Sequence, residues 1–265
     1  MSLPVDEIFG NAIQGEGAYM GVPSVFVRTG GCNLTCKGFG CKTISPLDGK
    51  TIITGCDSIH AVNAKHFKHT WIYYDCANDL ISDIKKVLPD ANTIENGNAE
   101  KPVIVFTGGE PLLHHRDEVM IGTLEYFISR GYRVLFETNG TIPIDFNKYN
   151  IYKKVSFSMS VKMSTSGEER HKRWKPEVVN EYLKHTKNSY FKFVLSKESI
   201  ENESNEIFEF LSMVPTFGIV YVMPKGETAE EVNENAAAVY KFAVKHSLRY
   251  SDRLHIRIYD NKRGV

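Results

Sequence analysis

Four of the five cysteines in this sequence fall within one short stretch, and they are the residues best suited to chemistry. Cys32 and Cys36 form a Cys-x3-Cys pair, which Cys41 and Cys56 follow. Thiolates are soft ligands that select zinc or iron–sulfur clusters, so this clustering indicates a metal centre. The odd number of cysteines argues against a disulfide framework.

Two kinds of metal centre fit the cysteines alone. All four could close around a structural zinc ion, and the protein would then be a non-catalytic zinc-binding adaptor. The histidines His60, His66 and His69 lie in the same region and keep a Cys/His zinc site open. Alternatively, three cysteines could hold a 4Fe–4S cluster and leave one iron open to a chelating ligand. The fifth cysteine, Cys76, is predicted to be a plain buried thiol at a helix start.

The elements that must position these residues alternate along the chain. Apolar runs predict strands over residues 24–29, 102–107, 132–136, 154–160, 190–195, 218–222 and 253–259. Helices are predicted around residues 80–88, 120–128, 178–183 and 207–211, and after a capping box that begins at Thr228. This alternation indicates a parallel sheet built from right-handed βαβ units. The strands are too few for a closed eight-stranded barrel, so we predict an α/β fold with a partial (β/α)6-type barrel.

A segment rich in cysteine, residues 32–76, interrupts the alternation. It shows no clear period and is predicted to be a long loop, inserted after the first barrel strand. Loops of such length inside a compact domain are usually functional. Because the sequence shows no internal repeat or linker, we expect residues 1–265 to form a single domain.

Reactive side chains follow successive predicted strands at the same end. In chain order they are Cys32, then Gly108, Gly109 and Glu110, then Thr138, and then Ser160 and Lys162. The carboxyl ends of parallel strands meet at one rim, where α/β folds carry their chemistry. The two glycines let the backbone approach a ligand closely, and Glu110 can accept a hydrogen bond from an ammonium group.

The composition excludes several classes of partner. The 32 Lys and Arg residues balance 32 Asp and Glu residues, and no basic block is present, which argues against a nucleic-acid partner. No apolar run reaches membrane-spanning length, and the N-terminus lacks the pattern of a signal peptide. We therefore expect a cytoplasmic protein without a membrane partner.

Several motifs resemble the radical S-adenosylmethionine (radical SAM) superfamily. An arginine-containing strand leads into Gly31-Cys32-x3-Cys36, and a later strand ends in Gly-Gly-Glu. Within that superfamily the sequence is similar to the 7-carboxy-7-deazaguanine synthase family. The similar segments are Phe9–Gly17, Phe26–Asn33, Cys56–Ser58, Thr107–Leu112, Phe136–Thr141 and Ser160–Lys162.

The resemblance implies three cofactors, namely a 4Fe–4S cluster, S-adenosylmethionine and Mg2+. It assigns the cluster to Cys32, Cys36 and Cys56, with Cys41 as the alternative third ligand. It implies that S-adenosylmethionine is held by Phe39, Gly108, Gly109, Glu110, Thr138, Ser160 and Lys162. It further implies that Ser58 is a magnesium ligand and that Gln14, Glu16, Arg28 and Thr107 face the substrate.

The activity that the resemblance implies is that of a carbon–nitrogen lyase. It contracts the ring of 6-carboxy-5,6,7,8-tetrahydropterin by radical chemistry, releases ammonia and forms 7-carboxy-7-deazaguanine for 7-deazapurine (queuosine-type) biosynthesis. Arg28 suits the substrate carboxylate because a guanidinium can donate two parallel hydrogen bonds. A structural ion pair is the alternative for an arginine in an apolar strand. No residue is assigned a catalytic role beyond that of a ligand.

Two further expectations concern partners, and one concerns a different enzyme. The resemblance implies a flavodoxin- or ferredoxin-type electron donor and a homodimer. Another small radical SAM enzyme, an activase that makes a glycyl radical on a partner enzyme, stays open as an alternative. It would share the cysteine loop and the Gly-Gly-Glu turn, but it would not need Arg28 or the Gln-Gly-Glu-Gly segment to bind a pterin.

Overall fold

The computed structural model describes residues 2–37, 40–89, 100–215, 218–262 and 264. The strands of its main sheet are β1 (Leu3–Ile13), β2 (Pro23–Thr29), β5 (Ile72–Tyr74), β6 (Val103–Gly108), β7 (Val134–Thr138), β8 (Ser156–Met159), β9 (Tyr190–Leu195), β10 (Ile219–Pro224) and β11 (Arg249–Tyr250). The helices are α1 (Ile59–Val62), α2 (Ala64–Phe67), α3 (Ala77–Lys86), α5 (Glu118–Ser129), α6 (Arg170–Arg173), α7 (Pro176–His185), α8 (Lys197–Ser212), α9 (Ala229–Lys245) and α10 (Leu254–Tyr259). None of the helices in these ranges is long and apolar enough to cross a bilayer.

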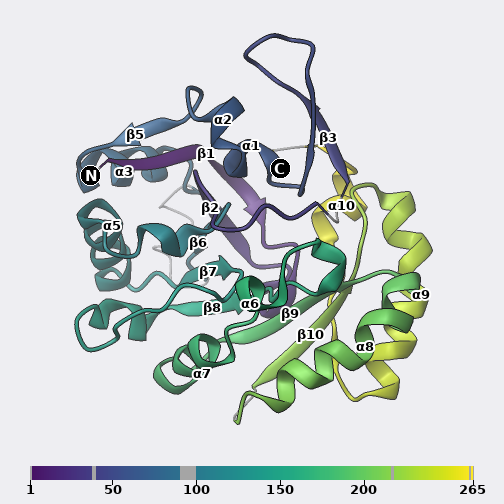
Figure 1. Cartoon of the computed structure of the whole chain (residues 1–265). Coiled ribbons are helices and arrows are strands. Elements are labelled where there is room, and N and C mark those ends of the chain that lie inside the picture. The colour runs from purple at the N-terminus through teal and green to yellow at the C-terminus, as the bar shows by residue number, and fades with distance from the viewer. Residues whose placement is uncertain (1, 38–39, 90–99, 216–217, 263, 265) are drawn as a thin grey trace.

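The nine strands form one sheet with the order β11-β10-β9-β8-β7-β6-β2-β1-β5. From β2 through β6, β7, β8 and β9 to β10, each strand pairs in parallel with the next. Figure 1 shows the longer helices α3, α5, α7, α8 and α9 around the outside of this sheet. The predicted α/β fold with a parallel sheet is therefore confirmed.

The first strand was not recognisable from the sequence. β1 pairs antiparallel with β2, and its register shifts between Val5 and Glu7 and again between Phe9 and Ala12. Such bulges break the alternation of apolar and polar residues by which strands are predicted. The pairing nevertheless stacks the ring of Phe9 on that of Phe26, with ring centroids 4.8 Å apart, and it brings the segment after β1 to the end of the sheet.

The core between the sheet and its helices is rich in aromatic rings. Phe106, Phe136 and Phe157, from three neighbouring strands, are fully buried, and the first two rings stack with centroids 5.1 Å apart. Phe157 also stacks on Tyr182 of α7, with centroids 4.4 Å apart. Rings packed in this way fix the relative positions of β6, β7 and β8, so the carboxyl ends of these strands are held rigidly.

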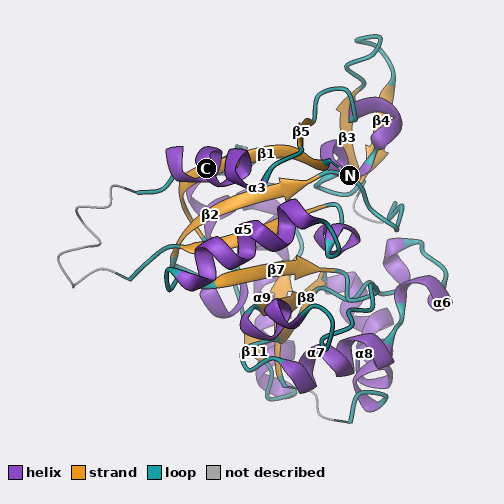
Figure 2. Cartoon of the chain, turned by 90° about the vertical axis from the view of Figure 1, so that its left-hand side faces the viewer, coloured by secondary structure: helices purple, strands orange, loops and turns teal. Residues whose placement is uncertain are grey.

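The cysteine-rich segment is more ordered than predicted. In place of one long loop it contains an antiparallel hairpin of β3 (Cys41–Ile44) and β4 (Ile52–Gly55), followed by α1, α2 and β5. Its own small core consists of Ile53, Ile59, Phe67 and Trp71. Figures 1 and 2 show the hairpin projecting beyond the main body. These elements are too short to produce a period in the sequence, which explains the wrong prediction.

Two other predictions from the sequence were wrong. Residues 253–259 were predicted as a strand from the alternation of apolar residues, but they contain helix α10, in which Ile256 is the buried residue. The short strand β11 already pairs with β10 at this edge of the sheet. Cys76 is exposed rather than buried, because it precedes α3 at the N-cap position.

Candidate active site

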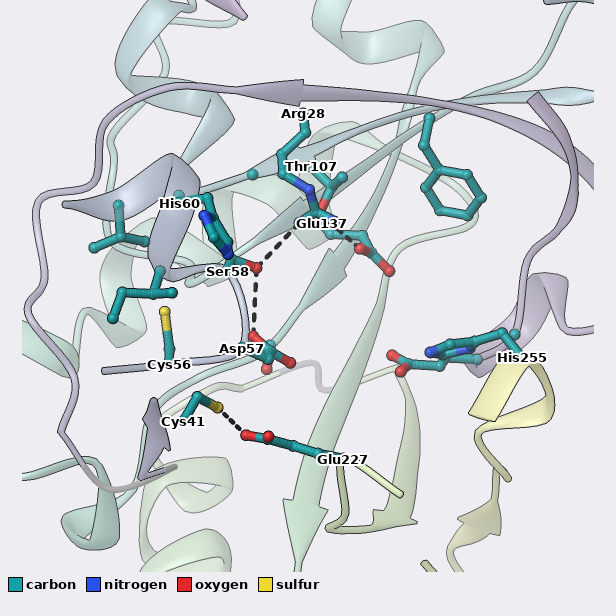
Figure 3. A pocket seen from close by; sticks show the side chains of 18 of the residues that line it. Arg28, Cys41, Cys56, Asp57, Ser58, His60, Thr107, Glu137, Glu227 and His255 are labelled. Atoms are coloured by element: carbon teal, nitrogen blue, oxygen red, sulfur yellow. Dashed lines mark hydrogen bonds between the residues drawn. The ribbon is translucent and has the colours of Figure 1, made fainter. Parts of the chain in front are cut away.

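A cavity of about 500 Å³ lies at the carboxyl ends of the parallel strands. Figure 3 shows part of its lining, with side chains that point into it from several elements. The predicted site residues that line it are Gln14, Glu16, Arg28, Cys32, Cys36, Cys41, Cys56, Ser58, Thr107, Gly108, Gly109, Thr138, Ser160 and Lys162. Phe39 lies outside the described residues, and Glu110 is absent from the described lining.

Three of the cysteine thiols lie close enough to influence one another. Burial raises the pKa of Cys32 to about 12, and negative charge on Glu110, Cys36 and Cys56 adds to the rise. Burial likewise raises the pKa of Cys56 to about 11. Three partly buried thiols around one cavity need a cationic centre to ionise, and soft thiolates suit iron–sulfur clusters. The donor set of Cys32, Cys36 and Cys56 therefore fits such a cluster.

The fourth cysteine of the group has a different partner. Cys41 lies at the start of β3, and its thiol donates a hydrogen bond to the carboxylate of Glu227 (Figure 3). Burial and this bond raise the pKa of the Cys41 thiol well above its usual range. Cys41 thus lines the same cavity, but its thiol is already hydrogen-bonded to Glu227, a residue far away in the sequence.

Of the three histidines in this region, His60 lines the cavity beside the cysteines, and the other two have different surroundings. His66 shares a hydrogen bond of 2.8 Å with the Ser45 hydroxyl, and His69 is exposed. Across the ranges that the structure describes, no three His, Cys, Asp or Glu side chains are arranged to hold one metal ion. The thiolates of an iron–sulfur cluster bind different iron atoms, so they need not meet at a single point.

The Gly-Gly-Glu turn after β6 packs directly against the cysteine loop. The backbone N–H of Gly109 donates to Thr29 O at 3.3 Å, and that of Glu110 donates to Gly31 O at 2.8 Å. A Cβ atom on Gly109 would lie 2.0 Å from Gly31 O, and Gly108 has a φ of +131°. The close approach that requires glycine is therefore an approach to the protein's own backbone, and it fixes Cys32 beside β6.

We expect Gly109→Ala to lower the iron content of the reconstituted protein, because the added methyl must push the Cys32 loop away. Overpacking of this kind costs about 1–3 kcal/mol, so the free energy of unfolding should also fall. Gly218→Ala is a matched control, since the nearest atom to its Cβ would be 3.5 Å away. Equal iron content in the two variants, measured after anaerobic reconstitution, would contradict this role of Gly109.

Glu110 is fully buried and hydrogen-bonded to the backbone and side chains around it. Its carboxylate accepts hydrogen bonds from the Thr138 hydroxyl at 2.8 Å, from Asn139 N at 2.7 Å and from Leu112 N at 3.1 Å. Burial raises its pKa to about 7, and these bonds oppose the rise. Glu110 therefore organises the backbone after β7, where Thr138 reaches the cavity.

Two residues after β8 complete this side of the cavity. Lys162 Nζ donates to the Ser160 hydroxyl at 3.2 Å. Burial raises the pKa of Cys36, and the charge of Lys162 opposes that rise. The loop after β7 is also tied to the cysteine loop, because Asn139 Nδ2 donates to Asn33 Oδ1 at 3.0 Å. The ends of β2, β7 and β8 thus form one connected wall.

Arg28 was interpreted from the sequence either as a substrate-facing residue or as part of a structural ion pair, and its position in the structure is compatible with both. Arg28 Nε donates to Glu7 Oε1 at 2.8 Å, so the ion pair exists, and Arg28 still lines the cavity. A second nitrogen, NH1, donates to the Ser58 hydroxyl at 3.1 Å, and that hydroxyl donates to Asp57 Oδ1 at 3.3 Å (Figure 3). Arg28 therefore connects β2 to the residues that follow Cys56.

A buried network of charges forms the opposite wall, and most of it was not found from the sequence. Glu16 accepts from Lys192 Nζ at 2.5 Å and from Arg253 Nε at 2.9 Å. Lys192 Nζ also lies 3.3 Å from Glu137 Oε1. Lys192 could have been found by the argument that identified Arg28. It is a cation inside the apolar strand β9, and such a cation needs partners. Arg253 was missed because residues 253–259 were wrongly predicted to form a strand.

These charges determine the protonation of Glu16. Burial alone would raise its pKa, but the cations of Lys192 and Arg253 outweigh burial and hold the pKa well below its usual range. For Lys192, burial would lower the pKa, and the carboxylates of Glu137 and Glu16 raise it instead. Glu16 is therefore ionised and can only accept hydrogen bonds from a ligand.

Comparison with known proteins agrees with this geometry, although no protein-family model matches the chain. A 7-carboxy-7-deazaguanine synthase from Hyperthermus butylicus is 30% identical over 97% of this chain and 92% of its own length. The synthase from Halobacterium salinarum is 29% identical over 98% of this chain and 91% of its own length.

Solved structures show the same fold at lower identity. The crystal structure of QueE from Escherichia coli is 18% identical and superposes with a TM-score of 0.59, covering 96% of this chain and 95% of that one. SuiB of Streptococcus suis, bound to S-adenosylmethionine, is 13% identical with a TM-score of 0.50 and covers 83% of this chain and 48% of its own.

The sheet, the cysteine loop and the motifs at its rim define a radical SAM enzyme. Within that class the relatives extend over nearly the full chain and carry one activity. The chain belongs to the 7-carboxy-7-deazaguanine synthase family.

Proposed function

We propose that the cavity is the active site in which this chain converts 6-carboxy-5,6,7,8-tetrahydropterin to 7-carboxy-7-deazaguanine, with release of ammonia. The observation that carries the proposal is that one cavity joins two different walls. One wall consists of thiols and the strand ends beside them, and the other is a network of ionised groups. The first suits a cluster and its cosubstrate, and the second suits a small polar heterocycle.

We assign the 4Fe–4S cluster to Cys32, Cys36 and Cys56. All three line the cavity, and the bond between Cys41 and Glu227 supports leaving Cys41 out. When bound, the cluster and S-adenosylmethionine supply the radical that starts the reaction. We further propose that the whole chain forms a single domain, a partial (β/α)6-type radical SAM barrel.

For S-adenosylmethionine we propose direct contacts with Gly108, Gly109, Thr138, Ser160 and Lys162. All of them line the cavity on the side of the thiols. Glu110 has a positioning role in this proposal, because its carboxylate holds Thr138 and the following backbone N–H in place. The ammonium of Lys162 suits the carboxylate of the ligand.

For the substrate we propose contacts with Gln14, Glu16, Arg28 and Thr107. Glu16, kept ionised, accepts hydrogen bonds from the N–H groups of the pterin, while Arg28 binds its carboxylate. Mg2+ would be held at Ser58, where the hydroxyl and the neighbouring Asp57 carboxylate supply the hard oxygen donors that this ion prefers. There it would help to fix the orientation of the substrate.

The setting of the reaction follows from the same chemistry. All five cysteines are free thiols, which suits the reducing cytoplasm. The enzyme needs single electrons, and we propose a flavodoxin- or ferredoxin-type donor. We further propose that the chain acts as a homodimer and that its product enters 7-deazapurine (queuosine-type) biosynthesis.

Anaerobic reconstitution followed by an ammonia assay tests the proposal. We expect brown protein with broad visible absorbance, and ammonia release that requires the carboxypterin, S-adenosylmethionine and a reductant together. Colourless protein with stoichiometric zinc would contradict the proposal, and so would a cluster-containing protein that releases no ammonia.

A further inference from the structure

Lys192 occupies a position between two carboxylates of the cavity wall. Its Nζ lies 2.5 Å from Glu16 Oε2 and 3.3 Å from Glu137 Oε1, and its side chain is only 7% exposed. The two carboxylates come from opposite directions: Glu16 follows the antiparallel strand β1, while Glu137 lies on β7. The ammonium therefore bridges segments that are far apart in the sequence and that meet at this cavity.

The other contacts of the two carboxylates distinguish Lys192 from its neighbours. Arg253 forms its ion pair with Glu16, through Oε1 at 2.9 Å, and acts on Glu137 only at longer range. Glu137 receives neutral donors besides Lys192, namely Thr107 Oγ1 at 2.9 Å and Gln14 Nε2 at 3.3 Å. Lys192 thus supplies positive charge to both carboxylates at once. Without this shared cation the two carboxylates would repel each other, and the buried Glu16 would tend to take up a proton.

We propose that Lys192 is a positioning residue for substrate recognition. Its ammonium holds the carboxylates of Glu16 and Glu137 in place, so that both can accept hydrogen bonds from the N–H edge of a pterin. The inference rests on the proposed function, because it takes the pterin as the ligand. It deepens that function because it makes Lys192 responsible for selecting ligands with an N–H edge. Lys192 itself needs no contact with the substrate.

The charged and titratable groups around the network support this division of roles. Glu16 is surrounded by Lys192, Arg253 and His255, and Lys192 also faces the Tyr190 hydroxyl. Burial lowers the pKa of His255, so at neutral pH this ring adds no positive charge that could replace Lys192. Removing the ammonium therefore leaves Arg253 as the neighbouring cation, and Arg253 also interacts with Asp57 at 3.6 Å.

Binding of 6-carboxypterin, a fluorescent and unreactive analogue of the substrate, tests the inference. Between about pH 5.5 and pH 7.5, the affinity of the wild type should be nearly constant, since Glu16 stays ionised throughout. Lys192→Gln should bind more weakly, and its affinity should fall at least about fivefold as the pH decreases across this range, because the buried Glu16 becomes protonated. Lys197→Gln, at an exposed lysine of α8, is the matched control.

A purely structural role would lower the affinity of Lys192→Gln equally at every pH, and that result would overturn the inference. Should Lys192→Gln not fold, Lys192→Arg decides. It keeps a positive charge beside both carboxylates, so its affinity should remain independent of pH. A folded Lys192→Arg protein whose affinity falls at least about fivefold as the pH decreases would overturn the inference too. If the wild type itself binds no 6-carboxypterin, the proposed function fails instead.

Discussion

Cys56→Ala should abolish incorporation of the iron–sulfur cluster, whereas Cys41→Ala should retain most of it. Both thiols line the cavity, but they differ in their neighbours. The charge of Cys56 acts on both Cys32 and Cys41, but only the Cys41 thiol of these three donates a hydrogen bond to Glu227. A cluster that keeps one iron open for a cosubstrate takes three thiolates, so the fourth cysteine is dispensable.

Iron and sulfide analysis after anaerobic reconstitution measures this difference. Cys76→Ala serves as the control, because Cys76 is exposed at the start of α3 and should not affect the cluster. If Cys41→Ala loses the cluster and Cys56→Ala keeps it, then Cys41 is the third ligand. In that case Ser58 also loses its proposed place beside the substrate, since that place depends on Cys56.

Arg28→Lys should lower turnover of the carboxypterin at least about tenfold while leaving the cluster spectrum unchanged. Lysine keeps the positive charge but loses the planar fork that binds a carboxylate at two points, and a hydrogen bond to a charged group is worth about 1.5–3 kcal/mol. Reductive cleavage of S-adenosylmethionine without substrate should persist, because Arg28 lies on the substrate side of the cavity.

The competing explanation is that Arg28 serves only its ion pair with Glu7. In that case Arg28→Lys would keep normal turnover, since a lysine can also pair with a carboxylate. Arg170→Lys is the matched control: it alters an exposed ion pair on α6, where a change should affect neither turnover nor the cluster. Steady-state rates of the three proteins, measured anaerobically, separate the two explanations.

The parts of this molecule that were predictable from its sequence are those with a regular period. The buried parallel strand β6 begins with a continuous apolar run, and β9 is an apolar run interrupted by Lys192; both were found within a residue or two. Helix α9 begins at Thr228, whose hydroxyl accepts from Glu231 N at 3.2 Å, as its capping sequence indicated. Bulged β1 and the short elements after Cys36 have no such period, and they were missed.

The site was predictable where a residue type is hard to explain otherwise. The clustered cysteines, together with an arginine in an apolar strand, allowed one face of the cavity to be predicted. Lys192 carried the same signal as Arg28 within β9, but without a motif around it. Arg253 and His255 could not be placed, because their position depends on α10 folding back over Gly15, whose O accepts from Leu254 N at 3.0 Å. Such a contact between chain ends leaves no local pattern.

Anaerobic turnover with S-adenosylmethionine present in less than the molar amount of 6-carboxy-5,6,7,8-tetrahydropterin tests the synthase assignment most directly. The expected result is 7-carboxy-7-deazaguanine, identified by its mass and absorbance, in more than one equivalent per S-adenosylmethionine, because the cosubstrate is regenerated. An outcome in which the protein binds its cluster and cleaves S-adenosylmethionine, yet leaves the pterin unchanged, would contradict the assignment.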